Sequence, residues 1–165
     1  AESNRYGEPK DELFTLPKNY ITLAGEAPKK SKKSKTPPQP IWPEFFDSYL
    51  EAALWSSTDQ STESGGYPLE DNYGVDDIDQ ESIDKAINET NAFIDENEAD
   101  LDKASAEFSA TAASLGFDFW LTRSGHGAGY WDRGYGALGD RLTKAAKVYG
   151  TSDIYVGDDK KLHIQ

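Results

Sequence analysis

A long apolar pattern with helical spacing runs through the middle of this chain and limits the folds that it can adopt. Asp79 is a candidate N-cap before this segment, and Gly116 is a candidate stop after it. The pattern therefore predicts a helix over 80–115, about 54 Å long at 1.5 Å per residue. Because this length is large for one compact domain, we expect a break near 97–100. The apolar positions recur about every 3.6 residues and are Ile83, Ile87, Thr90, Ile94, Leu101, Phe108, Ala112 and Leu115.

Two shorter helices and a hairpin are predicted on either side of this segment. Apolar spacing after a proline that suits a first helical turn predicts a helix over 43–55. A second helix is expected over 138–149, with lysines near its C-terminus, where cations are favoured. Residues 154–156 and 162–164 are two short apolar runs around a polar turn, which predicts a hairpin. The segment 56–76 is rich in Ser, Gly and Asp and is expected to be an irregular loop.

The segment 117–134 combines aromatic, charged and glycine residues. Residues 117–121 are predicted to form a strand, and 130–132 to pair with it across a glycine-rich connection. We expect Trp120 and Trp131 to be largely buried. Fixed loops often present recognition groups, so the polar residues here are candidates for contact with a partner. They are Arg123, Ser124, His126, Asp132 and Arg133.

Strands and helices are segregated along the chain, and the predicted class is therefore α+β. We expect a small antiparallel sheet packed against two or three helices, one of them long and acidic. Residues 1–40 are predicted to be a basic, Pro/Lys-rich extended tail, and residues 41–165 a single α+β domain. The run 29–35 holds five lysines and is followed by prolines, a composition that disfavours a packed core. It could bind anions, but a linker or a tail folded onto the acidic part of the chain is the favoured interpretation.

The charge is concentrated in one part of the chain. Residues 41–118 carry twenty acidic and two basic side chains, out of a net charge of −13 for the whole protein. Such a block repels nucleic acid and membrane surfaces and attracts basic proteins, although it could serve solubility alone. We predict a basic protein partner and no direct nucleic-acid binding by the core. The candidate contact residues lie on the outer face of the long helix and are Asp84, Glu89, Asp95, Glu96, Glu98 and Asp102.

No motif in the chain predicts a reaction, a metal or a cofactor. The acidic residues 76–81 lack the glycine and the glutamate that a calcium loop needs at its sixth and twelfth positions. Ser124 and His126 are too close in sequence to form a hydrolytic triad readily. The glycines at 125–129 lack the Lys and Ser/Thr of a phosphate loop. His126 could still act alone as a general base.

Other broad classes are disfavoured by composition. Cysteine is absent, no apolar run reaches the roughly 20 residues of a membrane span, and the first residues lack the apolar region of a secretory signal. Three arginines, at 123, 133 and 141, could form a cation–π patch with Trp120 and Trp131. Pairing of these arginines with the acidic helix is the favoured alternative.

Several segments together resemble a family of small acidic proteins that is widespread in tailed bacteriophages and bacteria. The resemblance covers about 42–160 and is carried by residues 54–59, 63–73, 117–134, 138–140 and 155–159. It implies a phage-type origin and a location in the host cytoplasm or the virion. The resemblance transfers no catalytic residue.

These observations lead to three functional hypotheses. The first is a phage-type accessory protein that binds a host or phage protein through an acidic, DNA-mimicking surface, and so inhibits a nucleic-acid-binding protein. The second is a virion or assembly component tethered by its N-terminal tail. The third is an enzyme centred on the His126 loop. The first is favoured, because the acidic block is the strongest signal in the sequence.

Overall fold

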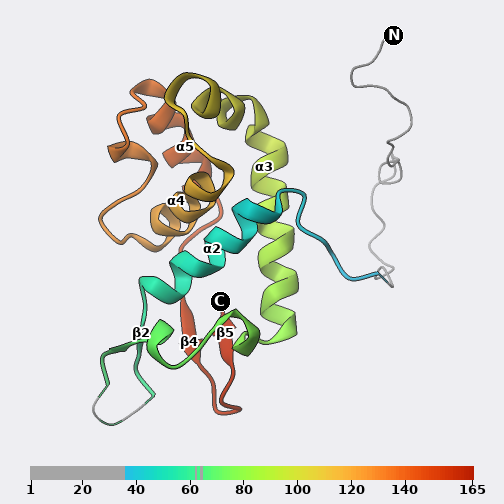
Figure 1. Cartoon of the computed structure of the whole chain (residues 1–165), viewed down its shortest axis with the longest axis vertical. Coiled ribbons are helices and arrows are strands. Elements are labelled where there is room, and N and C mark those ends of the chain that lie inside the picture. Colours follow the sequence, from blue (N-terminus) through green and yellow to red (C-terminus); the bar gives the residue numbers. More distant parts are fainter. Residues whose placement is uncertain (1–35, 62, 64) are drawn as a thin grey trace. The chain divides into compact units, whose positions relative to one another are not determined.

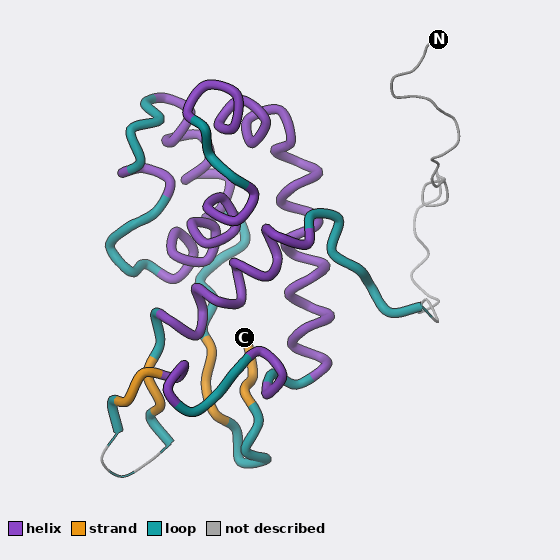
Figure 2. The backbone as a smooth tube through the Cα atoms, in the orientation of Figure 1, coloured by secondary structure: helices purple, strands orange, loops and turns teal. Residues whose placement is uncertain are grey.

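A computed structural model describes residues 36–61, 63 and 65–165, and shows an α+β fold (Figure 1). Four α-helices and two small antiparallel sheets of two strands each make up the described part of the chain (Figure 2). One compact unit spans Pro38–Gln165, so it begins three residues before the predicted domain boundary. The greater part of the predicted tail, including the lysine run, lies outside the described residues.

The helix α2, Pro43–Trp55, forms where the sequence predicts it. Pro43 occupies the first turn, where its missing N–H leaves no bond unmade. Its buried side chains include Phe45 and Tyr49, which are both fully covered. This face packs mainly against the helix α4, Ala112–Ser124.

The long acidic helix α3, Gln80–Phe108, starts as predicted and ends earlier than predicted. The side chain of Asp79 accepts a hydrogen bond from the Ser82 N–H at 3.3 Å, which confirms the N-cap. The expected break is present at Asn97, whose φ of −126° and ψ of 20° are not helical. The helix then stops at Phe108, because Ser109 adopts a left-handed conformation with φ of 61°.

The predicted strand at 117–121 is wrong, because these residues lie inside the helix α4. Thr111 and Ser114 start that helix with a reciprocal capping box, in which each side chain accepts the other's backbone N–H at 3.0 Å. Gly116 lies within the helix and is not a C-terminal stop. Since α4 is covered on nearly all sides, its apolar residues follow no single face, and their alternation imitates a strand.

The predicted strand partner at 130–132 is also wrong, because Tyr130–Asp132 forms a single 3₁₀ turn. Trp120 is fully buried as expected, whereas Trp131 is 41% exposed and corrects the expectation for that residue. Tyr130 is the buried member of the turn, and its hydroxyl donates to the Leu115 carbonyl at 2.6 Å. The turn is thus anchored to α4 by a side chain and not by strand pairing.

The C-terminal part follows the prediction closely. The helix α5, Ala137–Lys147, precedes a hairpin of β4, Ile154–Val156, and β5, Leu162–Ile164. Ile154 pairs with Ile164 in antiparallel register. The segment predicted as an irregular loop also contains a short hairpin of β2, Thr58–Asp59, and β3, Tyr67–Pro68.

Aromatic rings from separate elements form the centre of the core. Phe93 of α3 stacks on Phe119 of α4 with ring centroids 4.1 Å apart. Tyr49 of α2 lies 5.3 Å from both Phe119 and Trp120. These rings are fully buried and join three helices that are distant in sequence.

We predict that Gly116→Ala destabilises the protein, although alanine is the better helix former by about 1 kcal/mol. A Cβ at this position would collide with the backbone carbonyl of Phe45, which cannot rotate away. The expected loss in free energy of unfolding is roughly 1–3 kcal/mol, measured by urea denaturation. Gly74→Ala is the matched control, because nothing lies within 4 Å of a Cβ there. Equal stability of the two variants would contradict the close helix contact.

We predict that His163 stabilises the fold more in mild acid than in mild alkali. Its ring lies 2.9 Å from Asp159 and 3.2 Å from Asp79, and these contacts raise the pKa of His163 despite opposing desolvation. Because the folded pKa exceeds the unfolded value of about 6.5, the stabilisation is complete below that pH. It is lost as the pH rises through the folded pKa. The fall in Tm caused by His163→Gln should therefore be larger near pH 5.5 than near pH 8.5. An equal fall at both values would contradict the charged contact.

Candidate functional site

The side chain of Arg123 is buried in the core. It does not lie at the tip of the glycine-rich segment 125–129, called here the glycine loop. It is only 2% exposed and forms an ion pair with Glu89 of α3, with Nη1 and Oε1 2.7 Å apart. The same Nη1 donates to the Tyr49 hydroxyl at 2.9 Å. Nε and Nη2 donate to the carbonyls of Gly150 and Tyr149 at 2.9 and 2.8 Å. The prediction that Arg123 contacts a partner is therefore wrong.

The surroundings of Arg123 satisfy a charge that would otherwise be costly to bury. The guanidinium lies 5.5 Å from the Phe119 ring centroid and 5.9 Å from that of Tyr149, within cation–π range. Burial raises the pKa of Tyr49 to about 12, so its hydroxyl stays neutral. The guanidinium thus connects α2, α3 and α4 with the turn that follows α5.

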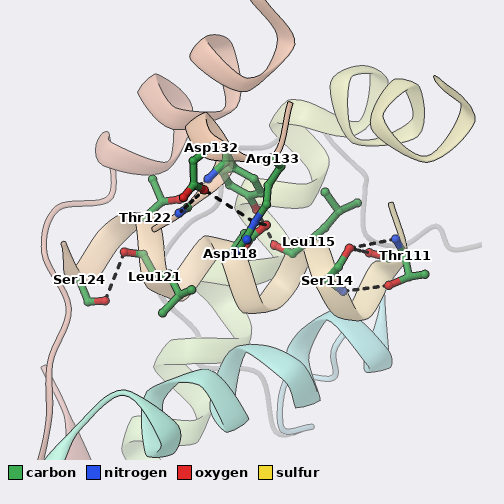
Figure 3. Close-up of polar contacts among 11 residues, drawn as sticks. Thr111, Ser114, Leu115, Asp118, Leu121, Thr122, Ser124, Asp132 and Arg133 are labelled. Carbon is green, nitrogen blue, oxygen red and sulfur yellow. Dashed lines mark hydrogen bonds and ion pairs between the residues drawn. The ribbon is translucent and has the colours of Figure 1, made fainter. Parts of the chain in front are cut away.

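A second arginine pair holds the 3₁₀ turn against α4. Arg133 donates to both carboxylate oxygens of Asp118, from Nε at 2.9 Å and from Nη2 at 2.7 Å (Figure 3). The Asp118 side chain is 4% exposed, whereas that of Arg133 is 38% exposed. The hydrogen bond to Asp118 raises the pKa of the guanidinium. Arg133 keeps an accessible edge, but its first role is structural.

Some of the other polar residues in this segment form hydrogen bonds within the fold, and others are exposed. The Thr122 hydroxyl accepts the Tyr130 N–H at 3.1 Å, and Asp132 accepts the Gly129 N–H at 3.3 Å (Figure 3). Ser124 is partly buried and donates to the Trp120 carbonyl at 2.8 Å. His126 is exposed and lines a pocket together with other chain segments.

That pocket, called here the His126 pocket, has a volume of about 360 Å³. Its walls are residues 56–58 and 60–61, His126, and residues 153–156. They come from the β2 region, the glycine loop and β4. The structure therefore brings together three segments that the sequence analysis treated separately.

Several of the predicted acidic contact residues bind other groups of the protein itself. Glu89 forms an ion pair with Arg123, and Glu96 accepts a hydrogen bond from the Tyr149 hydroxyl at 2.7 Å. Asp84 accepts a hydrogen bond from the Gln80 side chain at 2.8 Å. These three acids therefore also support the fold or the helix that carries them.

The remaining acids form what we call the acidic stripe, Asp95, Glu98 and Asp102. All three are exposed, and within the described parts of the chain none has a hydrogen-bonding or ion-pairing partner for its side chain. Glu98 and Asp102 are four residues apart and share one face of α3 after the break at Asn97, and Asp95 lies two residues before that break. Desolvation of the Asp95 carboxyl is the main cause that raises its pKa, and repulsion from the nearby Glu96 raises the pKa further.

The favoured interpretation of the arginines is confirmed for two of them. Arg123 pairs with Glu89, and Arg141 pairs with Asp100 through two hydrogen bonds of 3.1 and 3.0 Å. Both acids lie on α3, whereas Arg133 pairs within the α4 region instead. The cation beside the Trp131 ring is Lys147, at 6.0 Å, and not an arginine.

Comparisons with protein-family models, with curated proteins and with solved structures find no match for this chain. The resemblance to small acidic phage proteins therefore stays a prediction from the sequence. The geometry itself gives two candidate surfaces, the acidic stripe and the His126 pocket.

Across residues 36–61, 63 and 65–165, no three His, Asp or Glu side chains are grouped so that they could hold a metal ion. None of the helices in the described part of the chain has the length and apolar character needed to cross a membrane.

We predict that Arg123→Ala lowers the free energy of unfolding by about 3–5 kcal/mol, because it leaves two carbonyls without a donor and leaves Glu89 only its longer contact with Lys85, at 3.4 Å. Arg141→Ala is the matched control, since it also removes an arginine paired with α3, but at an exposed site. Its expected cost is below about 1 kcal/mol. Urea denaturation of both variants measures the difference. Similar losses in the two variants would show that burial does not set the importance of Arg123.

Proposed function

We propose that this protein binds a basic surface of a host or phage protein through the acidic stripe. The observation that carries the proposal is the distribution of acids on α3. Those facing the core or α5 are paired with arginine or tyrosine, whereas Asp95, Glu98 and Asp102 are left exposed. A basic partner would supply the missing countercharges.

Long-range electrostatics support the same choice. Residues 36–165 carry 25 acidic and 9 basic side chains, a net charge of −16. A surface within such a field attracts a cationic partner and accelerates its association.

A DNA-mimicking inhibitor is the sharper form of the proposal. Glu98 and Asp102 are about 6 Å apart along the helix axis at 1.5 Å per residue, and Asp95 lies on the other side of the break at Asn97. One strand of B-DNA presents a charge about every 3.4 Å of helix axis, so the stripe is a sparser anionic row. It could compete with nucleic acid for a basic groove, in the host cytoplasm or in the virion. The other two hypotheses, a tethered virion component and an enzyme centred on His126, have no comparable support.

We predict that Asp95→Asn, Glu98→Gln and Asp102→Asn together reduce partner capture about tenfold or more, because they remove the three charges of the acidic stripe. The full-length protein is immobilised, exposed to host lysate at low and high salt, and the captured proteins are identified by mass spectrometry. High salt should weaken capture by the parent and stabilise the free protein, since screening reduces its self-repulsion.

The matched control is Glu44→Gln, Asp47→Asn and Glu51→Gln. These acids are exposed on α2, and their removal changes the net charge by the same amount. If the control loses as much capture as the stripe variant, net charge alone explains binding. If the stripe variant captures partners as well as the parent, the stripe is not the binding surface.

A further inference from the structure

The geometry points to the His126 pocket as a binding site for a neutral polyhydroxylated ligand about the size of one sugar ring. This inference does not rest on the proposed protein-binding function, because the pocket and the acidic stripe share no residue. The chemistry of the walls, their charge and their rigidity each support it.

The polar groups of the walls suit a ligand with many hydroxyls. Five residues with hydroxyl side chains line the pocket, at 56, 57, 58, 61 and 155, together with Gln60, His126 and Asp153. Hydroxyl and amide groups both donate and accept hydrogen bonds, and a neutral imidazole does so through its two nitrogens. A sugar ring presents donors and acceptors in the same mixture around its edge.

Several of these groups keep bonding capacity for a ligand. The Ser56 hydroxyl accepts the Trp120 indole N–H at 2.9 Å, which leaves its own proton available. The Ser61 hydroxyl donates to Asp59 at 2.6 Å, which leaves its lone pairs available. As far as the described residues show, the side chains of Ser57, His126 and Asp153 have no hydrogen-bonding partner.

The charge of the pocket disfavours ionic ligands. Among the described residues, no lysine or arginine lines it, and the surrounding domain is strongly acidic, so phosphates and carboxylates would be repelled. One aspartate is too few for a bare metal ion, which takes several protein or solvent oxygens. A volume of about 360 Å³ lies at the lower end of the range for small-molecule pockets. A single neutral ring is therefore the favoured occupant.

Hydrogen bonds and a ring contact hold several wall residues in place, which lowers the entropic cost of binding. Ser56 is bonded to a fully buried tryptophan, and Ser61 is bonded to the buried Asp59. Tyr155 is 42% exposed and stacks on His163 with ring centroids 5.6 Å apart. Tyr155 also lines the pocket, so it can present apolar surface to the C–H face of a sugar.

Two-dimensional ¹H–¹⁵N NMR on the full-length protein provides a direct test. The probes are D-glucose, D-galactose and N-acetyl-D-glucosamine, each titrated through the millimolar range that weak binding requires. At least one sugar should shift the indole N–H signal of Trp120 in a saturable way, because that group bonds a wall residue. The indole signals of Trp42 and Trp131 should stay in place, since neither residue lines the pocket.

Asp153→Asn and Ser57→Ala should each weaken the sugar affinity at least about threefold. Asp158→Asn is the matched control, because this exposed aspartate lies on the same hairpin but outside the pocket. Thermal unfolding confirms that each variant is folded. The inference is overturned if no sugar shifts Trp120, or if the variants and the control bind alike. It is also overturned if adenosine or inorganic phosphate binds in place of every sugar.

Discussion

The guanidinium of Arg123 is a permanent charge inside the core, and the arrangement of the helices depends on how that charge is satisfied. Removing it from water carries a desolvation cost of several kcal/mol, which only a complete set of partners can offset. Glu89 supplies the countercharge, Tyr49 a neutral hydroxyl, and the turn after α5 two carbonyls. Since these partners come from separate elements, the network forms only when α2, α3, α4 and the segment after α5 are in place together. A buried pair of this kind favours one arrangement over others that are equally apolar.

The same network explains why the segment 117–134 looks like a recognition site while mostly forming framework. Its charged residues form ion pairs within the protein: Arg123 pairs with Glu89, and Asp118 pairs with Arg133. Gly129 allows a close approach that a side chain would block, because a Cβ there would collide with Thr122. Residues 125–127 and 131–134 are exposed, and His126 is among the former. A substitution at a buried position of this segment is therefore expected to act first on stability.

The long acidic helix, its N-cap, the helix after Pro43 and the C-terminal hairpin were predictable, because local signals determine them. The break in the long helix followed from its length, which is large for one compact domain. Apolar spacing, the capping side chain of Asp79 and the proline at a first turn do not depend on distant residues. The helix α4 was not predictable in this way. It is buried on nearly all sides, so its pattern fits a buried strand equally well. Gly116 imitates a stop signal, although the close contact with Phe45 is what requires a glycine there. The His126 pocket escaped prediction because tertiary packing joins its three segments, which lie far apart in the sequence.

The acids of α3 show how one helix can serve both the fold and a surface. An acid paired with an arginine stabilises the protein, most where the arginine is buried, while an exposed acid among others destabilises it slightly by repulsion. Glu89, paired with the buried Arg123, and Asp100, paired with the exposed Arg141, belong to the first group. The acidic stripe belongs to the second. Unpaired charge is not needed for folding, and three exposed acids close together carry a small, continuing cost in stability. Solubility alone would be served equally well by acids scattered over all exposed surfaces. Their concentration around the break at Asn97 is what solubility leaves unexplained and what a basic partner would account for.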